Sequence, residues 1–133
     1  MFTIDPADPM PIYAQLDRAI RAAIATGQLK VGDRLPTVRQ LAVDLRVNAN
    51  TVAKVYVELE RSGVVATQRG IGTFVRENPT PPPLATATRR DRERELRPLV
   101  DRLLADASTI GIPFHEVVQY VKSLEARHTK ENS

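Results

Sequence analysis

Apolar residues recur with the spacing of an α-helix in two short, neighbouring segments of the first half of the chain. They are Val38, Leu41, Ala42 and Leu45 in the first segment and Val52, Val55, Tyr56 and Leu59 in the second. In each segment these positions form one face of a 3.6-residue repeat, which predicts a short amphipathic helix. Because only residues 46–49 separate the two segments, the pattern predicts a helix-turn-helix, a motif whose second helix typically enters the DNA major groove.

Residues that favour helix ends flank both segments. Thr37 is expected to cap the first helix, whereas Asn50 is expected to cap the second helix and Gly63 to end it. A further helix is predicted upstream, beginning near Pro11 and ending at Gly27. Its apolar stripe consists of Ile12, Leu16, Ala19, Ile20, Ala23 and Ile24. This helix should pack across the helix-turn-helix and complete a three-helix core.

The residues after the second helix have the composition of a β-hairpin. Residues 64–68 and 73–76 predict two strands, and the glycine-bearing run 69–72 predicts the turn between them. A hairpin that directly follows a helix-turn-helix is a wing. Residues 34–35 can add a single short strand that pairs with this wing.

The last third of the chain has a different pattern. Residues 77–88 contain four prolines, which predicts a semi-rigid, extended linker. Residues 89–109 and a segment beginning at residue 114 then show apolar stripes with helical spacing, separated by a turn at residues 110–113. Pro98 interrupts the first of these helices, which either begins there or is kinked there.

Two amphipathic helices of this size cannot bury both apolar stripes by themselves. We expect the same helix pair from a second copy of the chain to cover them in a small symmetric bundle; packing against the N-terminal domain is the alternative. The expected dimerisation residues are Leu96, Leu99, Val100, Leu103, Leu104, Phe114, Val117, Val118, Val121 and Leu124. The predicted fold is therefore mainly α with a small β-wing. It comprises a winged helix-turn-helix DNA-binding domain (1–76), a proline-rich linker (77–88) and a C-terminal two-helix dimerisation hairpin (89–133).

Charge permits a nucleic-acid partner without requiring one. Lys and Arg total 19 against 16 Asp and Glu, which gives a net charge of +3. The charges are spread evenly, with ten basic and eight acidic residues in 1–78 and nine and eight in 79–133. Any DNA-facing patch must therefore come from local placement of basic side chains.

No pattern typical of catalysis or metal binding accompanies these elements. The chain has no cysteine, and its two histidines, His115 and His128, lack spaced partner ligands. Gly70 and Gly72 lack the rest of a phosphate-loop fingerprint, so we expect neither an enzyme nor a cofactor. No apolar run approaches the ~18 residues of a membrane span, and the N-terminus lacks a signal pattern. We therefore expect a cytoplasmic protein without a membrane partner.

Nine residues of the predicted helix-turn-helix and wing have side chains or backbone suited to double-stranded DNA. They are Arg34, Arg39, Asn48, Asn50, Thr51, Lys54, Arg69, Gly70 and Thr73. Arg and Lys bind phosphates or guanine, Asn can pair with adenine, and Thr can contact a thymine methyl group or a phosphate. The alternative for Arg39 is a surface ion pair with Asp44 or Asp33, and the alternative for Asn50 is capping alone. Tyr56 is expected in the core rather than at a base.

Three sequence runs in this region are informative because of the order in which they occur and the spacing between them. They are Gly-Asp-Arg-Leu-Pro-Thr-Val-Arg-Gln-Leu-Ala (32–42), Val-Asn-Ala-Asn-Thr-Val (47–52) and Arg-Gly-Ile-Gly-Thr-Phe-Val (69–75). Together they resemble the signature of the GntR family of bacterial transcription regulators, over most of residues 11–76. Arg39 stands at the arginine of the family's Leu-Pro-x-x-Arg motif. Ala49 and Ala53 stand where some family members carry arginine, which leaves the operator sequence open.

The length of the C-terminal region indicates which subfamily of the GntR family the chain resembles. About fifty residues follow the linker, and a short two-helix region of this kind resembles the YtrA subfamily. The resemblance implies a homodimeric regulator, often a repressor and frequently linked to transporter genes. A two-fold protein is expected to bind a near-palindromic operator with half-sites about 10 base pairs apart, or a multiple of that. The residues alone leave a winged-helix protein-interaction module as an alternative function, and they do not reveal whether a small-molecule effector exists.

Overall fold

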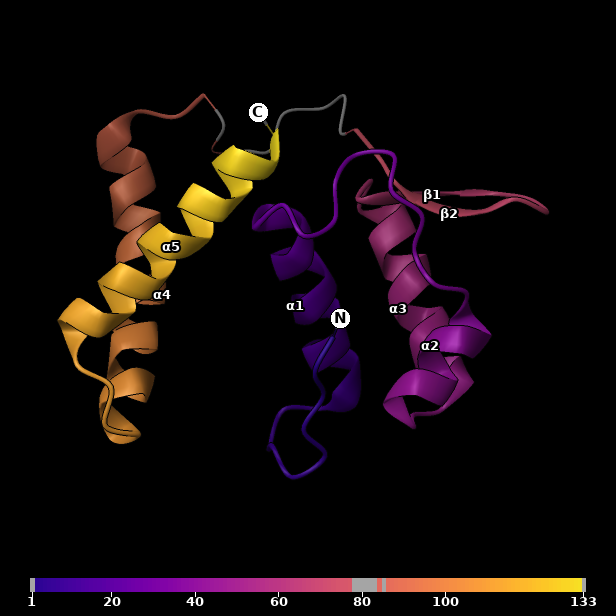
Figure 1. The fold of residues 1–133 in the computed structure, drawn as a ribbon, viewed down its shortest axis with the longest axis horizontal. Helices are drawn as coiled ribbons and strands as arrows, with labels where there is room; N and C mark the ends of the chain where they lie inside the picture. The colour runs from indigo at the N-terminus through magenta and orange to yellow at the C-terminus, as the bar shows by residue number, and fades with distance from the viewer. Residues whose placement is uncertain (1, 78–83, 85, 133) are drawn as a thin grey trace. The chain divides into compact units, whose positions relative to one another are not determined.

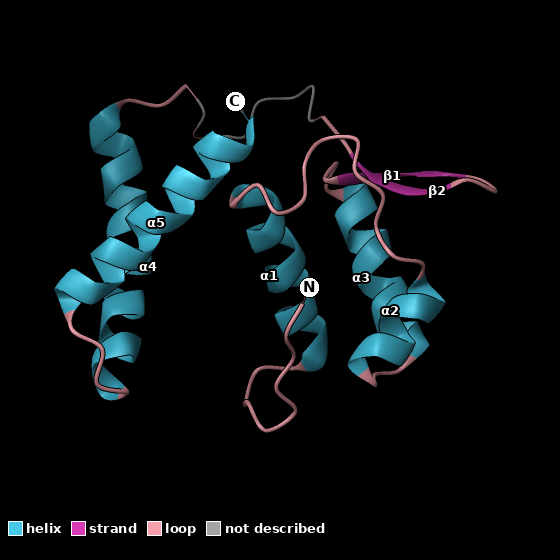
Figure 2. Cartoon of the chain, in the orientation of Figure 1, coloured by secondary structure: helices cyan, strands magenta, loops and turns pink. Residues whose placement is uncertain are grey.

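The computed structural model describes residues 2–77, 84 and 86–132, with side chains as far as Arg127 (Figures 1 and 2). The elements, in chain order, are α1 (Ile12–Ala25), α2 (Val38–Leu45), α3 (Ala49–Arg61), β1 (Val65–Gln68), β2 (Gly72–Val75), α4 (Arg89–Thr109) and α5 (Phe114–Asn132). The described residues thus form five helices and one two-stranded sheet, which confirms the predicted fold class of a mainly α protein with a small β-wing. The chain divides into two compact units, residues 1–78 and 79–133.

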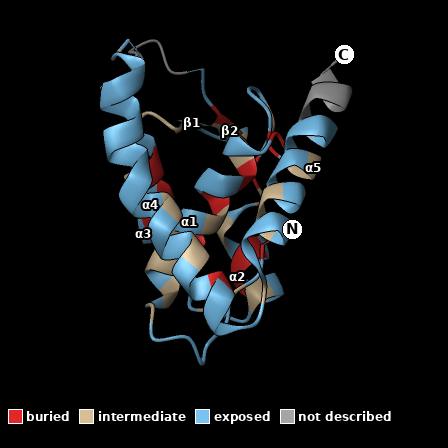
Figure 3. Cartoon of the chain, turned by 90° about the vertical axis from the view of Figure 1, so that its left-hand side faces the viewer, coloured by how far each residue is buried: buried red, intermediate tan, exposed pale blue. Residues whose placement is uncertain are grey.

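The first unit encloses an apolar core between its three helices and its hairpin. Its largest fully buried side chains are Leu16 and Ile20 of α1, Val52, Val55 and Leu59 of α3, and Val65 of β1. Leu41 and Ala42 of α2 and Val75 of β2 join the same cluster, and the buried positions are visible in Figure 3. Full burial of each Val, Leu or Ile side chain contributes about 1.5–3 kcal/mol. The predicted three-helix core is therefore confirmed.

The helix ends differ from the sequence predictions in two places. The prediction that Asn50 caps α3 is wrong, because the Asn48 side chain accepts a hydrogen bond from the Asn50 backbone N–H at 2.8 Å and α3 begins at Ala49. α2 ends at Leu45, and Arg46 follows with a left-handed backbone at φ 57°. Pro11 likewise precedes α1 as its N-cap residue rather than lying inside it.

The hairpin pairs as predicted. β1 and β2 are antiparallel, with Val65 opposite Val75 and Gln68 opposite Gly72. Arg34 forms a bridge with Phe74, and the backbone N–H of Leu35 donates to the Thr73 carbonyl at 2.8 Å. The predicted pairing of residues 34–35 with the wing is therefore present, but as an isolated bridge rather than as a strand. It holds the segment before α2 against the wing.

The second unit is an α4–α5 helix pair joined by a turn at residues 110–113. Thr88 caps α4 by accepting a hydrogen bond from the Asp91 N–H at 3.2 Å. α4 continues through Pro98 from Arg89 to Thr109, so the alternative that the helix begins at Pro98 is wrong. Ala107 is the one hydrophobic residue that is buried among the described residues of this unit.

Part of the predicted linker lies outside the described residues, namely 78–83 and 85. In the remainder of that stretch the backbone N–H of Ala87 donates to the Leu84 carbonyl at 3.2 Å and forms a turn. No helix among the described residues is sufficiently long and apolar to cross a membrane. Nor does any group of three or more potential metal ligands occur in that part of the chain.

Candidate nucleic-acid interface

A reciprocal pair of hydrogen bonds fixes the start of α2. The Gln40 backbone N–H donates to the Thr37 hydroxyl oxygen at 3.1 Å, and the Thr37 backbone N–H donates to the Gln40 side-chain oxygen at 3.0 Å. This capping box confirms Thr37 as the N-cap. Arg39 lies between the two, in the first turn of α2, and its side chain is exposed. No ion pair between described residues involves Arg39, so neither Asp44 nor Asp33 neutralises it there.

The predicted DNA-binding residues of α3 lie in its first two turns. Asn50 and Lys54 are exposed, and Thr51 is half-buried. The side-chain oxygen of Asn48 is occupied by the cap, which leaves its amide NH₂ as the group available to a ligand. Asn50, freed from the capping role, keeps both its donor and its acceptor. The capping role that the sequence assigned to Asn50 therefore belongs to Asn48, and of the two predicted DNA-binding asparagines Asn50 is the better candidate for a bidentate contact with adenine.

Tyr56 connects α3 to the segment that precedes α2. Its side chain is only 7% exposed, and its hydroxyl donates a 2.6 Å hydrogen bond to the Pro36 carbonyl. Burial raises the pKa of Tyr56 to about 12, because the charged phenolate would lose its hydration. The prediction that Tyr56 belongs to the core is confirmed. The hydrogen bond also holds the chain at Pro36 and so sets the position of Arg34 and Arg39 on either side of it.

The wing brings four of the predicted residues to one open groove. Arg34, Arg69, Gly70 and Thr73 all line it, together with the start of α2 and Tyr56. Arg34 and Arg39 share an adjoining groove along α2. The Thr73 hydroxyl lies 3.2 Å from that of Thr67 on the neighbouring strand. The tip of the hairpin extends away from the helices of its unit (Figure 2), and Arg69 at this tip is exposed.

Gly72 has a role that the sequence did not indicate. A Cβ atom at this position would lie 2.7 Å from Nε of Arg34, and Gly72 has φ +150°. The absence of a side chain therefore lets the Arg34 guanidinium lie across β2. The sequence did contain a signal for one missed residue, Gln40, because Thr-x-x-Gln before an apolar run is the spacing of a capping box. The sequence contained no comparable signal for the contact between Arg34 and Gly72, because these two residues lie far apart in the chain.

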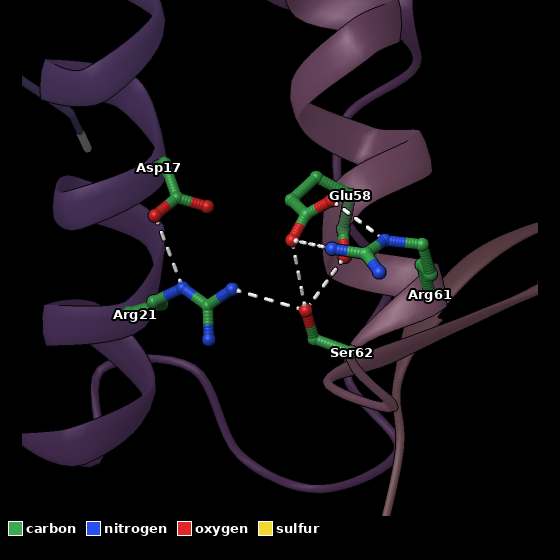
Figure 4. A network of polar contacts seen from close by, with 5 residues as sticks. All are labelled: Asp17, Arg21, Glu58, Arg61 and Ser62. Atoms are coloured by element: carbon green, nitrogen blue, oxygen red, sulfur yellow. Dashed lines mark hydrogen bonds and ion pairs between the residues drawn. The ribbon is translucent and has the colours of Figure 1, made fainter.

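A polar network on the outside of the unit joins α1 to the end of α3 (Figure 4). Arg21 pairs with Asp17 at 3.1 Å and donates to the Ser62 hydroxyl at 3.4 Å. Arg61 binds both carboxylate oxygens of Glu58, at 2.8 and 2.9 Å. The hydrogen bond from Arg61 holds the pKa of Glu58 below its ordinary value, and the same bond raises the pKa of Arg61. The network fixes α3 against α1 and contains none of the nine predicted DNA-binding residues.

The ten predicted dimerisation residues of the second unit fall into two sets. Val100, Leu104, Val117, Val118 and Leu124 are half-buried, whereas Leu96, Leu99, Leu103, Phe114 and Val121 are exposed. Two further large apolar residues, Ile110 and Tyr120, are 73% and 60% exposed and were missed because they lie outside the selected stripes. The chain therefore has one apolar face between its own two helices and a second that is exposed.

Comparison with known proteins places these elements in a family. The model of the gntR family of bacterial regulatory proteins matches residues 12–75. The chain is 34% identical to the HTH-type transcriptional repressor YtrA of Bacillus subtilis (strain 168) over 126 residues, which cover 95% of this chain and 93% of that protein. Its structure is similar to that of YtrA from Sulfolobus acidocaldarius, a GntR-family transcription factor. That likeness has 35% identity and a TM-score of 0.55 over 78% of this chain and 97% of the other.

A third likeness concerns the first unit. It is similar to AraR(DBD), which was solved in complex with operator ORX1, with 28% identity and a TM-score of 0.50 over 56% of this chain and 92% of the other. Both YtrA matches extend beyond the winged unit, and the match to the Bacillus subtilis protein covers nearly the whole chain. The two proteins are named as a transcriptional repressor and a transcription factor. The chain belongs to the GntR family of bacterial regulatory proteins and is a transcription regulator with a winged helix-turn-helix.

Proposed function

We propose that the protein is a cytoplasmic, homodimeric repressor that binds a near-palindromic DNA operator and whose targets include transporter genes. The two-fold symmetry of the dimer would present two recognition helices to half-sites about 10 base pairs apart, or a multiple of that. The repressor role is supported by the likeness to YtrA of Bacillus subtilis over nearly the whole chain. Operator binding is supported by the likeness of the first unit to AraR(DBD), which was solved on its operator.

The observation that carries the DNA-binding part is the shared placement of unneutralised basic side chains. Arg34 and Arg69 line one groove between the wing and α2, and Arg39 lies on the adjoining groove with Arg34. All three are exposed. We assign Arg34, Arg39, Lys54 and Arg69 to phosphate or guanine contacts. Asn48, Asn50 and Thr51 are assigned to base edges or phosphates, and Gly70 and Thr73 to the sugar–phosphate backbone at the wing.

The dimer part rests on the exposed apolar face of the second unit. Leu96, Leu99 and Leu103 of α4 and Ile110, which directly follows α4, recur at spacings of three, four and seven residues. This is the spacing of a helix-packing seam. All four are about half or more exposed. Because the half-buried residues already cover the face between α4 and α5, this second face is available to a second copy. A symmetric pair would form a four-helix bundle.

Anisotropy titration tests the DNA-binding part. The probes are a duplex from immediately upstream of the protein's own gene and the duplexes that the chain selects from a random library. The affinity for a selected duplex should fall steeply between two salt concentrations, because each phosphate contact releases a counterion. Arg39→Ala should weaken binding by about 5- to 150-fold, or about 1–3 kcal/mol, with the dimer intact.

Arg18→Ala is the matched control, since Arg18 is also exposed on a helix of the first unit and lies outside both grooves. It should change the affinity by less than about twofold. Failure of the wild-type chain to select any sequence, or binding that ignores salt, would contradict the proposal and leave the protein-interaction module as the alternative.

A further inference from the structure

A small apolar hollow lies between α2 and the start of the recognition helix α3. It is lined by Val38, Arg39, Ala42, Val43, Val47 and Ala49. Five of these six residues are aliphatic, and Arg39 provides the one charged edge. Val43 is 70% exposed, and Ala49 at the first position of α3 is exposed too. The hollow therefore presents methyl groups to the outside at the point where the two helices of the motif meet.

The adjoining face of α3 offers few side chains that can form hydrogen bonds. Ala49 and Ala53 lie four residues apart and so share one face of the helix, and neither has a polar side-chain atom. A base opposite this face cannot be recognised through its donors and acceptors by these two residues. The one apolar feature that a base pair presents in the major groove is the C5-methyl group of thymine, which alanine and other aliphatic side chains contact.

The groups around the hollow favour DNA over an apolar partner. Arg39 forms its edge, Asn50 follows Ala49 in the first turn of α3, and Lys54 lies in the second turn. All three are exposed. An aliphatic protein segment would leave these polar groups without partners. A DNA major groove supplies phosphates and base edges to them and methyl groups to the hollow.

We propose that this hollow recognises thymine methyl groups in the operator and that Val43 and Ala49 are specificity-determining residues. The inference rests on the proposed DNA-binding function and extends it. Within each half-site, one thymine would place its methyl group between Val43 of α2 and Ala49 of α3. Arg39 beside it would bind the adjacent phosphate or guanine. The selectivity would be for thymine over cytosine at that position, through the methyl group rather than through a hydrogen bond.

The methyl group can be removed without changing base pairing. Each thymine of the duplex that the wild-type chain selects is replaced in turn by deoxyuridine, and the affinity is measured by anisotropy. One symmetric position in each half-site should lose about fourfold in affinity per methyl group, or about sixteenfold when both half-sites are changed, since burial of one such group is worth about 0.8 kcal/mol. Where that thymine is changed to cytosine, 5-methylcytosine should recover part of the loss.

The protein side is tested with Val43→Ser, which removes both methyl groups of the side chain and leaves a hydroxyl. It should reduce the deoxyuridine penalty at the same position toward onefold, and Ala49→Ser should do likewise. Val57→Ser is the matched control, because Val57 is 64% exposed on α3 and does not line the hollow. Its deoxyuridine penalties should equal those of the wild type.

Three results overturn the inference, and they are distinguishable. If the wild-type chain selects no duplex, the proposed DNA-binding function fails and this inference fails with it. If it selects a duplex but no deoxyuridine substitution changes the affinity by more than about twofold, only the thymine contact is wrong. The inference is also wrong if Val43→Ser and Ala49→Ser leave a deoxyuridine penalty unchanged, since the methyl group is then recognised elsewhere.

Discussion

The two units of the chain differ in how far they bury leucines that recur with helical spacing. In the first unit, Leu16 and Leu59 are fully buried. In the second, Leu96 is 53% and Leu99 67% exposed, although each belongs to an apolar stripe with helical spacing. The first unit closes a core by packing three helices and a hairpin, whereas two helices can cover only one face of each other. From this difference we propose that the first unit folds as a single chain and that the second requires an apolar partner.

The largest expected effect comes from placing a charge on the exposed face of the second unit. Leu99→Asp should convert the proposed dimer into a monomer and weaken operator binding by about 100-fold or more, because an unpaired carboxylate in an apolar interface costs several kcal/mol. Sedimentation velocity and anisotropy measure the two effects. Ala105→Asp is the control, since Ala105 is exposed on α4 away from this face. A Leu99→Asp chain that remains dimeric would contradict the comparison.

The same substitution should have different consequences in the two units. Leu59→Ala should lower the free energy of unfolding of the first unit by about 2–5 kcal/mol, because it removes fully buried methyl groups and leaves a cavity. Leu99→Ala should change that free energy by less than about 0.5 kcal/mol. Hydrogen exchange of the α1–α3 amides reports on this unit specifically. Equal loss of protection in both variants would show that the two units do not differ as proposed.

A smaller effect is expected at the link between α3 and the segment before α2. Tyr56→Phe removes the hydrogen bond to the Pro36 carbonyl and should cost about 0.5–1.5 kcal/mol of stability. The pKa of Tyr56 is raised from 10.0 to about 12. The folded state therefore keeps this proton when the unfolded chain loses it, so that stability falls as the pH rises from 10 toward 12.

Urea unfolding at several alkaline pH values measures this dependence. The difference in stability between the wild type and Tyr56→Phe should shrink across that range, because the variant has no phenol to titrate. A stability difference that stays constant between pH 10 and 12 would show that the Tyr56 hydroxyl does not cause the pH dependence.

The smallest effect is expected at the exposed network between α1 and α3. The pKa of Glu58 is below its ordinary value because of its hydrogen bond from Arg61, so its contribution to stability is present above that ordinary value and is lost as the pH falls below it. Glu58→Gln should therefore be slightly less stable than the wild type at pH 7 and nearly equal to it at acidic pH. Thermal unfolding of both proteins at both pH values measures this. If the stability difference between the wild type and Glu58→Gln grew on acidification, the direction assigned to the Glu58 pKa shift would be wrong.

Most of the winged unit could be predicted because its determinants are local. Thr37 stands at capping spacing from Gln40, and the glycines at 70 and 72 allow the hairpin turn. The start of α3 could not be predicted to the residue. Asn48 and Asn50 both have side chains that favour an N-cap, and in the structure Asn48 takes this position. The nine DNA-binding residues stay predictions, although four of them line one groove beside the wing.

The sequence by itself determined which residues share a face, because periodicity follows from the geometry of a helix or strand. It thereby determined the three-helix core, the wing and the family. Only the tertiary structure decided which faces are covered, since burial depends on what the rest of the chain packs against them. It also brought Arg34 against Gly72 and joined Val43 of α2 to Ala49 of α3 in one hollow. Those contacts depend on the angle at which separate elements meet, and no local spacing encodes that angle.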